Sequence, residues 1–486
     1  MISGENRPAG GRMDRRALFV LLAFIVLSAG IVAWWLFYDP VKDFKVSLPG
    51  MDNRKKGAAV AGKPVIIGSQ FSFYKTLPDI PGTRWPRFRG SGFDNISKEP
   101  VKLLDRWAKT GPSVLWKKTL GEGHAAPAVY DGKVYILDYD EADKSDQLRC
   151  FSLSSGEEMW KRGYKVHLKR NHGLSRTVPA VSAKFVLTIG PKCQVMCVDR
   201  LNGNFLWGLD LVKDYDTEIP FWFTGQCPLL DNDTAIIAPG GKAILVAIDC
   251  NTGKKLWETP NPKGWKMSHS SVMPMTLNGK KMYVYFAIGG ICGISASGTD
   301  RGKVLWESSE FAPSVVAPSP LMLDEGKIFL TAGYGAGSAI LQVRQSEGQF
   351  TVKVLQKYKP QEGLASEQQT PVFYNGFIFG ILPKDAGSLR NQFACYRSGD
   401  CKTAVMSSGK TDRFGLGPYI MADGKFFILN DDGEMTIAKV SSKQFIVLDK
   451  ARIIDGQDSW GPIAITGGYL LMRDSKQLVC IDVKAP

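Results

Sequence analysis

The stretch that decides the fold is AIDCNTGKKLW, residues 247–257, in which an apolar run meets a turn and then a segment ending in tryptophan. A Gly four residues before a Trp occurs in four copies: GEEMW (156–160), GNFLW (203–207), GKKLW (253–257) and GKVLW (302–306). Successive Trp residues lie 47, 50 and 49 residues apart, and Trp116 lies 44 residues before Trp160. This period is typical of a β-propeller, in which each repeat forms one four-stranded blade.

Each repeat also opens in the same way, with a Pro, an apolar run, a tight turn and a second apolar run. Four of the turns contain Asp-Gly or Asn-Gly, at 131–132, 278–279, 375–376 and 423–424. Such pairs favour a two-residue hairpin, because both central positions need positive φ. The openings begin at Pro127, Pro179, Pro228, Pro274, Pro320, Pro371, Pro418 and Pro462. We therefore predict an all-β fold, an eight-bladed β-propeller of four-stranded blades.

The last repeat holds only three strands before the sequence ends at Pro486. Residues 114–119, ahead of the first full repeat, can supply its missing outer strand. Pairing them with the last repeat would close the ring and remove an exposed sheet edge. The recurring Trp residues are expected to pack between blades rather than to bind a ligand.

An apolar segment of 22 residues without a charge, 17–38, lies near the N-terminus. It is long enough to cross a bilayer core of about 30 Å as a helix. Arg12, Arg15 and Arg16 precede it, and Trp34, Trp35 and Tyr38 end it. This asymmetry predicts a single-pass anchor in the inner (cytoplasmic) membrane, with the N-terminus in the cytoplasm and the propeller in the periplasm or outside.

A cleaved signal peptide is the alternative, because Ser28, Ala29 and Gly30 are small residues. The apolar run continues well past Gly30, which favours an uncleaved anchor. The predicted organisation is therefore a cytoplasmic tail (1–16), a transmembrane signal-anchor helix (17–38), a tether (39–82) and the propeller (83–486).

The composition limits the partners and the redox chemistry. The net charge is +14, but Lys and Arg are spread along the chain and no nucleic-acid motif occurs, so we expect no nucleic-acid partner. Nine Cys are too few for a disulfide scaffold at this length. Cys395 and Cys401 could pair in an oxidising compartment. Without a CxxC pair, a zinc ribbon or a c-type haem has no support.

The segments that precede the opening Pro residues should converge at one mouth of the central channel. Polar and aromatic groups that converge on a concavity predict a binding site, although they could also serve only to hold the loops. The candidates are His124, His172, Arg176, Trp222, Gln226, His269, Glu367, Gln368, Arg413 and Trp460.

We predict no metal site and no catalytic residue at this mouth. The three candidate His residues could ligate zinc or copper only if they met across the channel. The sequence spacing supports no Ser-His-Asp arrangement, phosphate-binding loop or carboxylate pair.

Residues 247–257 and CVDRLNGNFLW (197–207) resemble the repeat of the pyrroloquinoline-quinone (PQQ) dehydrogenase type of propeller. The segment WPRFRGSGFDNIS, residues 85–97, resembles the lead-in of bacterial exported proteins that carry this repeat. The resemblance covers about residues 85–483.

The resemblance implies two branches with different functions. Quinoprotein dehydrogenases hold PQQ and Ca²⁺ in the central funnel and often carry a vicinal Cys pair, which this sequence lacks. The second branch includes the propeller scaffold lipoprotein of the outer-membrane-protein assembly machine, whose lipobox is missing here.

We therefore expect a non-enzymatic scaffold for envelope or membrane proteins, or for a ligand, without a cofactor. One alternative is a PQQ- or metal-dependent oxidoreductase that uses PQQ with Ca²⁺. The other is a module that binds an envelope polysaccharide, for which Trp222 and Trp460 would suit sugar stacking.

Overall fold

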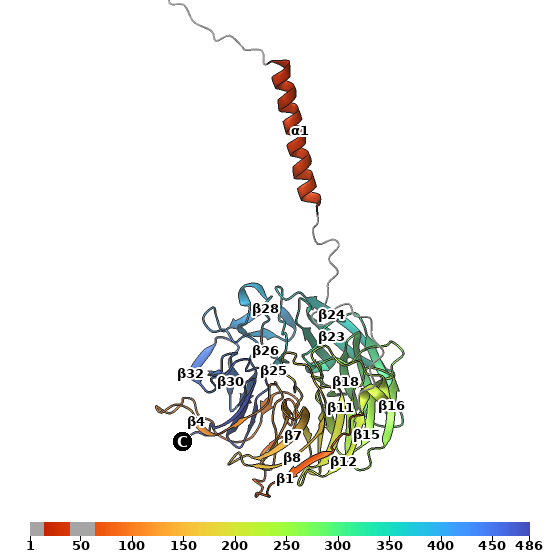
Figure 1. Cartoon of the computed structure of the whole chain (residues 1–486), viewed down its shortest axis with the longest axis vertical. Helices are drawn as coiled ribbons and strands as arrows, with labels where there is room; N and C mark the ends of the chain where they lie inside the picture. The colour runs from red at the N-terminus through yellow and green to blue at the C-terminus, as the bar shows by residue number, and fades with distance from the viewer. Residues whose placement is uncertain (1–13, 39–63) are drawn as a thin grey trace, which may run out of the picture. The chain divides into compact units, whose positions relative to one another are not determined.

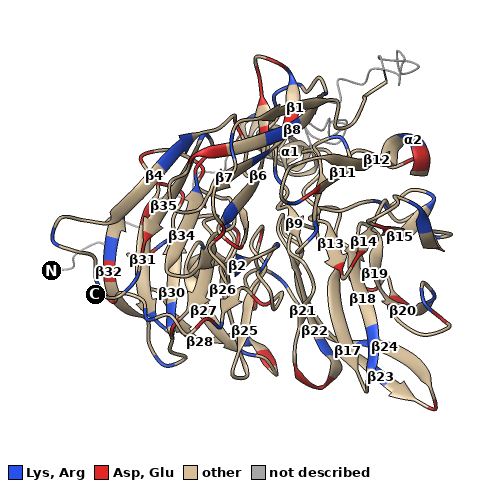
Figure 2. Ribbon diagram, turned by 90° about the horizontal axis from the view of Figure 1, so that it is seen from below, with Lys and Arg blue, Asp and Glu red and all other residues tan. Residues whose placement is uncertain are grey.

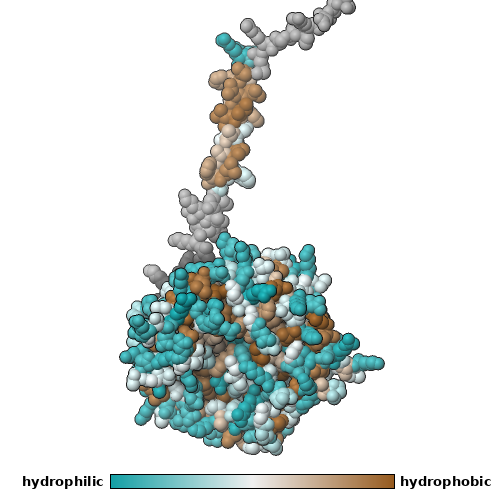
Figure 3. All heavy atoms as spheres, turned by 180° about the vertical axis from the view of Figure 1, so that it is seen from behind, coloured by the Kyte–Doolittle hydropathy of each residue, from teal (hydrophilic) through white to brown (hydrophobic). Residues whose placement is uncertain are grey.

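The computed structural model describes residues 14–38 and 64–486, which divide into two units, Met1–Pro64 and Val65–Pro486. In the first unit, α1 (Arg15–Phe37) is an apolar helix without a buried residue (Figure 3). Asp14 caps it by accepting a hydrogen bond from the backbone N–H of Arg16. Among the described residues, α1 alone is long and apolar enough to cross a membrane, as a single-pass anchor or a signal sequence would be. Arg12 and most of the predicted tail lie outside the described residues.

The second unit confirms the predicted fold, since eight sheets follow one another around a ring (Figure 1). Each sheet contains one four-stranded blade, and in blades one to seven the four strands run in sequence order from the axis outward. Blades one to four contain β5 (Ala128–Tyr130), β6 (Lys133–Asp140), β7 (Ser145–Ser152) and β8 (Glu158–Lys165); β9 (Ala180–Val181), β10 (Phe185–Ile189), β11 (Gln194–Asp199) and β12 (Phe205–Asp210); β13 (Leu229–Asp231), β14 (Thr234–Ile237), β15 (Ala243–Asp249) and β16 (Lys255–Pro260); and β17 (Met273–Leu277), β18 (Lys280–Ala287), β19 (Gly290–Ser295) and β20 (Val304–Ser308).

Blades five to eight repeat the pattern. They contain β21 (Leu321–Met322), β22 (Lys327–Ala332), β23 (Gly337–Ser346) and β24 (Gln349–Tyr358); β25 (Val372–Tyr374), β26 (Phe377–Ile381), β27 (Phe393–Arg397) and β28 (Asp400–Ser407); β29 (Tyr419–Ala422), β30 (Lys425–Leu429), β31 (Glu434–Lys439) and β32 (Ile446–Arg452); and β33 (Ala464–Thr466), β34 (Tyr469–Arg473) and β35 (Gln477–Asp482) with β4 (Ser113–Thr119). The connections include one short helix, α2 (Leu211–Tyr215), and two 3₁₀ turns, Asp324–Gly326 and Gly387–Leu389.

The ring closes as predicted, because β4 pairs antiparallel with β35 and becomes the outer strand of blade eight. Trp116 of β4 lies opposite Cys480, and its indole N–H donates to the carbonyl of Leu153 in blade one at 2.8 Å. Arg473, buried at the end of β34, adds a second tie by donating to the carbonyl of Gly121 at 3.1 Å. Two separate interactions therefore join the last blade to the first.

The recurring Trp and Gly residues pack against each other across blade boundaries. A Cβ added at the turn residue Gly203 of blade two would come 2.6 Å from the ring of Trp160 in blade one. The same relation holds between Gly253 and Trp207, at 2.7 Å. The Trp of each outer strand thus fills the space above the turn of the next blade, as the repeat pattern predicted.

The propeller unit begins earlier in the sequence than predicted. Residues from Val65 belong to it, although the sequence assigned 39–82 to a tether. Within that segment, β1 (Gln70–Phe73) adds an antiparallel strand to the outer edge of β8. Of the predicted tether, residues 39–63 lie outside the described residues.

Residues 85–97, which we call the axial plug, connect the inner segments of several blades. At the start, β2 (Arg84–Trp85) pairs with β5 of blade one. At the end, β3 (Ile96–Ser97) pairs in parallel with β29 of blade seven. Between them, the buried guanidinium of Arg89 donates to the carbonyls of Thr370 (2.8 Å) and Pro371 (2.9 Å) in blade six. The plug therefore connects the inner strands of blades one and seven with the segment before β25 of blade six.

The nine cysteines all lie within the described residues and are buried free thiols. The suggested pair of Cys395 and Cys401 does not form. Cys395 packs with Phe379 in the core between blades six and seven, whereas Cys401 packs with Tyr358 in the core between blades five and six. The two thiols point to opposite faces of one sheet, which separates them. Lys and Arg are distributed over several blades and alternate with Asp and Glu (Figure 2).

Candidate functional site

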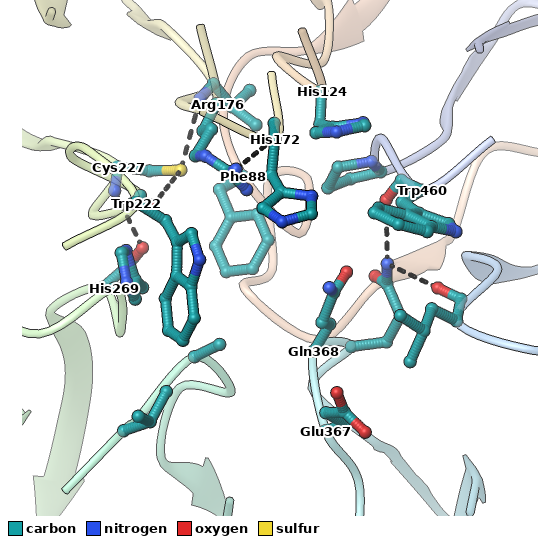
Figure 4. A pocket seen from close by; sticks show the side chains of 18 of the residues that line it. Phe88, His124, His172, Arg176, Trp222, Cys227, His269, Glu367, Gln368 and Trp460 are labelled. Atoms are coloured by element: carbon teal, nitrogen blue, oxygen red, sulfur yellow. Dashed lines mark hydrogen bonds between the residues drawn. The ribbon is translucent and has the colours of Figure 1, made fainter. Parts of the chain in front are cut away.

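A cavity of about 370 Å³ lies on the propeller axis, and we call it the axial pocket. Each of the eight segments that lead into an inner strand contributes at least one residue to its wall. Phe88 of the axial plug lies at the centre of the close-up view and lines the pocket as well (Figure 4). A second cavity, of about 560 Å³, adjoins it and shares His124, His172 and Trp460. The predicted convergence of these segments is thus present.

Eight of the ten predicted residues line the axial pocket. They are His124, His172, Arg176, Trp222, His269, Glu367, Gln368 and Trp460. Gln226 does not, because its buried amide turns into blade three, where it donates to the carbonyl of Ala238 at 3.1 Å. Arg413 does not line the pocket either, because its side chain turns toward blade six and donates to the carbonyl of Arg390 at 2.6 Å.

Sequence reasoning missed three notable members of the wall, Phe88, Tyr334 and Lys384. Phe88 comes from the plug, whose position over the axis no repeat pattern reveals. Tyr334 and Lys384 come from the connections between the second and third strands of blades five and six, not from the segments before the inner strands. The FRG motif was the only sequence signal for Phe88, and the two others had none.

Aromatic side chains form two walls of the pocket (Figure 4). Trp222 stacks on Tyr334 with ring centroids 5.7 Å apart and planes 15° apart. On the other side, Trp460 stacks on His124 at 5.0 Å and 29°. The indole N–H of Trp460 donates to Asp431 at 2.8 Å, which fixes the ring. Two braced indoles therefore flank the space between them.

Two imidazoles of the pocket are held neutral. Burial lowers the pKa of His124 to about 3, and the positive charges of Arg176 and Arg473 act in the same direction. Burial, with a further contribution from Arg176, lowers the pKa of His269 to about 4. At neutral pH both rings therefore serve as hydrogen-bonding groups without charge.

Arg176 is the cation on this side of the pocket. Burial lowers the pKa of its guanidinium to about 10, so it remains charged at neutral pH, and no carboxylate counteracts this effect. One of its terminal nitrogens donates to the carbonyl of His172. Glu367 lies on the opposite side (Figure 4), where burial raises its pKa and the charge of Lys384 partly offsets that rise.

The family model described as "Outer membrane protein assembly factor BamB" matches residues 144–387, half of the chain. The chain belongs to this family. The predicted resemblance to PQQ-type repeat proteins is thereby confirmed. A search of curated proteins finds no match.

Solved structures agree with the BamB-type fold. BamB from Moraxella catarrhalis is 11% identical, with a TM-score of 0.51 over 76% of this chain and 99% of that one. A europium-containing methanol dehydrogenase is 12% identical, with a TM-score of 0.52 over 82% of this chain and 89% of that one. At these identities the likeness concerns the fold alone.

The donor set of the axial pocket does not fit PQQ with Ca²⁺. Calcium takes six to eight oxygen ligands, with carboxylates prominent among them. The pocket offers one carboxylate, Glu367, and places the cations Arg176 and Lys384 around the same space. Within residues 14–38 and 64–486, no group of three or more His, Cys, Asp or Glu could hold a metal ion. The three His residues line one cavity without forming such a group.

Proposed function

We propose that this protein is a membrane-anchored, extracytoplasmic propeller that acts as a binding scaffold in the cell envelope, with the axial pocket as its ligand site. The observation that carries the proposal is the convergence of all eight inner segments on one cavity. Such a concave site, with apolar walls and a few placed polar groups, is the usual form of a small-molecule site.

The envelope location is supported by α1 and by the family. Arg15 and Arg16 begin the helix, while Trp34 and Trp35 lie in its last turn. Positive charge before an apolar helix favours the cytoplasmic side, and aromatic rings favour the opposite interface. The family is described as an outer membrane protein assembly factor, which is a role within the envelope.

A role in binding other proteins is supported by the outer strands. Leu206 and Leu256 directly precede the recurring Trp residues of their blades, Val304 lies two residues before Trp306, and all three are more than a third exposed. Phe205, two residues before Trp207, corresponds to Val304 and is exposed as well. Apolar groups repeated on neighbouring outer edges are a surface that envelope partners can cover.

To test this proposal, the full chain is purified in mild detergent from its native envelope. Small molecules that remain bound are then identified by mass spectrometry after denaturation. The double variant Trp222→Ala, Trp460→Ala should lose the bound compound, because it removes both aromatic walls. Arg413→Gln, outside the pocket, should retain it. The added compound should also raise Tm, since a ligand at a hundredfold excess over Kd stabilises by about 2.7 kcal/mol. Retention of the compound by the double variant would exclude the axial pocket as its site.

A further inference from the structure

Arg176 places a positive charge in the axial pocket, and among residues 14–38 and 64–486 no carboxylate forms an ion pair with it. Its Nε is shielded from solvent and has no hydrogen-bond acceptor. Its terminal nitrogen meets only the backbone carbonyl of His172, and no carboxylate acts on its pKa. Arg176 as a whole is half-buried, and removing part of a charged group from water without a partner has a free-energy cost. An anion that binds at this position would offset that cost.

The second requirement comes from the aromatic walls. Trp222 stacks on Tyr334, and Trp460 stacks on His124, so each indole has an aromatic partner. Both lie beside the space into which Arg176 points (Figure 4). A rigid indole face binds a ring that presents C–H groups or a π surface. A small inorganic anion, which has no ring, would make no stacking contact with these indole faces.

The third requirement comes from the neutral polar groups. The imidazoles of His124 and His269 are uncharged, and the pocket also contains Gln368 and Gln369. Glu367, with its raised pKa, lies across the pocket from Arg176 (Figure 4). Hydroxyl groups both donate and accept, so they match this mixture of imidazole, amide and carboxyl groups. A fused aromatic acid without hydroxyls would leave most of them without partners.

We propose that the ligand of the axial pocket is an acidic sugar, with its ring against the Trp faces, its hydroxyls on the neutral polar groups and its carboxylate on Arg176. This inference rests on the proposed ligand-binding function. The volume of about 370 Å³ lies within the range of small-molecule sites and suits one or two sugar rings. The adjoining cavity of about 560 Å³ gives room for the sugars that follow in an oligosaccharide.

The test measures binding to the full chain in detergent by ligand-detected NMR and calorimetry. The probes are glucuronate, galacturonate and mannuronate, each compared with its neutral hexose, and PQQ with Ca²⁺ as an aromatic acid. At least one uronate should bind ten times more tightly than its neutral hexose. Arg176→Gln should reduce uronate affinity at least tenfold while neutral hexose affinity stays within twofold. The matched control Arg413→Gln should change neither, and circular dichroism should confirm that both variants fold.

The other outcomes separate this inference from the proposed function. Equal affinity for uronate and hexose, or an equal loss for both in Arg176→Gln, would overturn the role of the carboxylate. Binding of PQQ in the pocket without sugar binding would overturn the acidic sugar but leave a ligand site in place. If no sugar binds while a native compound is lost in the Trp222→Ala, Trp460→Ala double variant, the ligand class is wrong and the proposed function stands. If neither a probe nor a native compound binds, both proposals fail.

Discussion

Gly203 lies against the indole ring of Trp160, so closely that a Cβ on the glycine would come 2.6 Å from the ring. The glycine belongs to the outer turn of blade two and the tryptophan to the outer strand of blade one. Gly156 and Gly302 stand in the same relation to Trp116 and Trp257. The repeat therefore encodes the contact between neighbouring blades as well as the blade itself.

The first prediction concerns this contact. Gly203→Ala should lower the free energy of unfolding by about 2–4 kcal/mol, combining overpacking of about 1–3 kcal/mol with a backbone penalty of about 1 kcal/mol at positive φ. Gly376→Ala is the matched control, because its φ of 77° is similar to the 70° of Gly203 and nothing lies within 4 Å of its added Cβ. Denaturant unfolding of both variants isolates the indole contact. Equal losses would show that the backbone alone accounts for the effect.

The second prediction concerns ring closure by β4. A chain that begins at Val65 should unfold cooperatively, and one that begins at Ser113 should also do so at a lower Tm, because it keeps β4 but lacks the plug. A chain that begins at Gly121 loses β4 and leaves β35 as an unpaired edge, so it should aggregate. Size-exclusion chromatography and thermal melts distinguish the three. Similar behaviour of the chains that begin at Ser113 and Gly121 would contradict closure through β4.

The third prediction is a dependence of stability on pH. His124 has a pKa of about 3 in the folded chain and an ordinary value of 6.5. Below pH 6.5, His124 therefore binds a proton in the unfolded chain but stays neutral in the folded chain. The free energy of unfolding falls as the pH falls. His124→Phe keeps a ring against Trp460 and removes this titration.

Between pH 6.5 and 5, the wild type should lose about 1–2 kcal/mol more than His124→Phe, since one group contributes at most about 1.4 kcal/mol per pH unit. Urea unfolding at the two pH values measures the difference. His269, with a pKa of about 4, adds a parallel loss that remains in the variant. If the variant lost more stability between pH 6.5 and 5 than the wild type, the lowered pKa of His124 would be contradicted.

The fourth prediction concerns membrane orientation. A reporter that is active only in the cytoplasm, fused after Pro486, should be silent, because the arginines before α1 favour a cytoplasmic N-terminus. A reporter that is active only outside should give signal at the same position. Replacing Arg12, Arg15 and Arg16 by Asn should raise the cytoplasmic signal. Strong cytoplasmic activity of the unmodified chain would reject the orientation.

The blades were predictable because their signals are local and repeated. A Pro opening, an Asn-Gly or Asp-Gly turn and a Gly followed by Trp each specify a short segment, and positive φ at Asp131 and Asn375 confirms the hairpin turns. By contrast, β1 occurs once and lacks any repeat, so its addition to β8 was invisible in the sequence. Strand pairing over such a distance depends on the completed ring.

The site was predictable only in part, since register gives the position of a backbone segment and not the direction of a side chain. Trp222 and His269 were placed correctly by register alone. Gln226 has the right register, but hydrogen bonds to Ala238 satisfy its amide inside the blade. Phe88 and Tyr334 reach the pocket from segments outside the repeat register, which only the three-dimensional arrangement reveals.

The axial plug contributes to the wall of the pocket on the propeller axis. Phe88 lines the pocket, and the hydrogen bonds of Arg89 hold the plug to blade six beneath it. We expect a compound that enters by the loop side to leave by the same route, rather than to pass along the axis from one face of the ring to the other. Such an arrangement suits a protein that binds and releases its ligand at a single face of the ring. A partner that delivers or receives the ligand would then approach that same face.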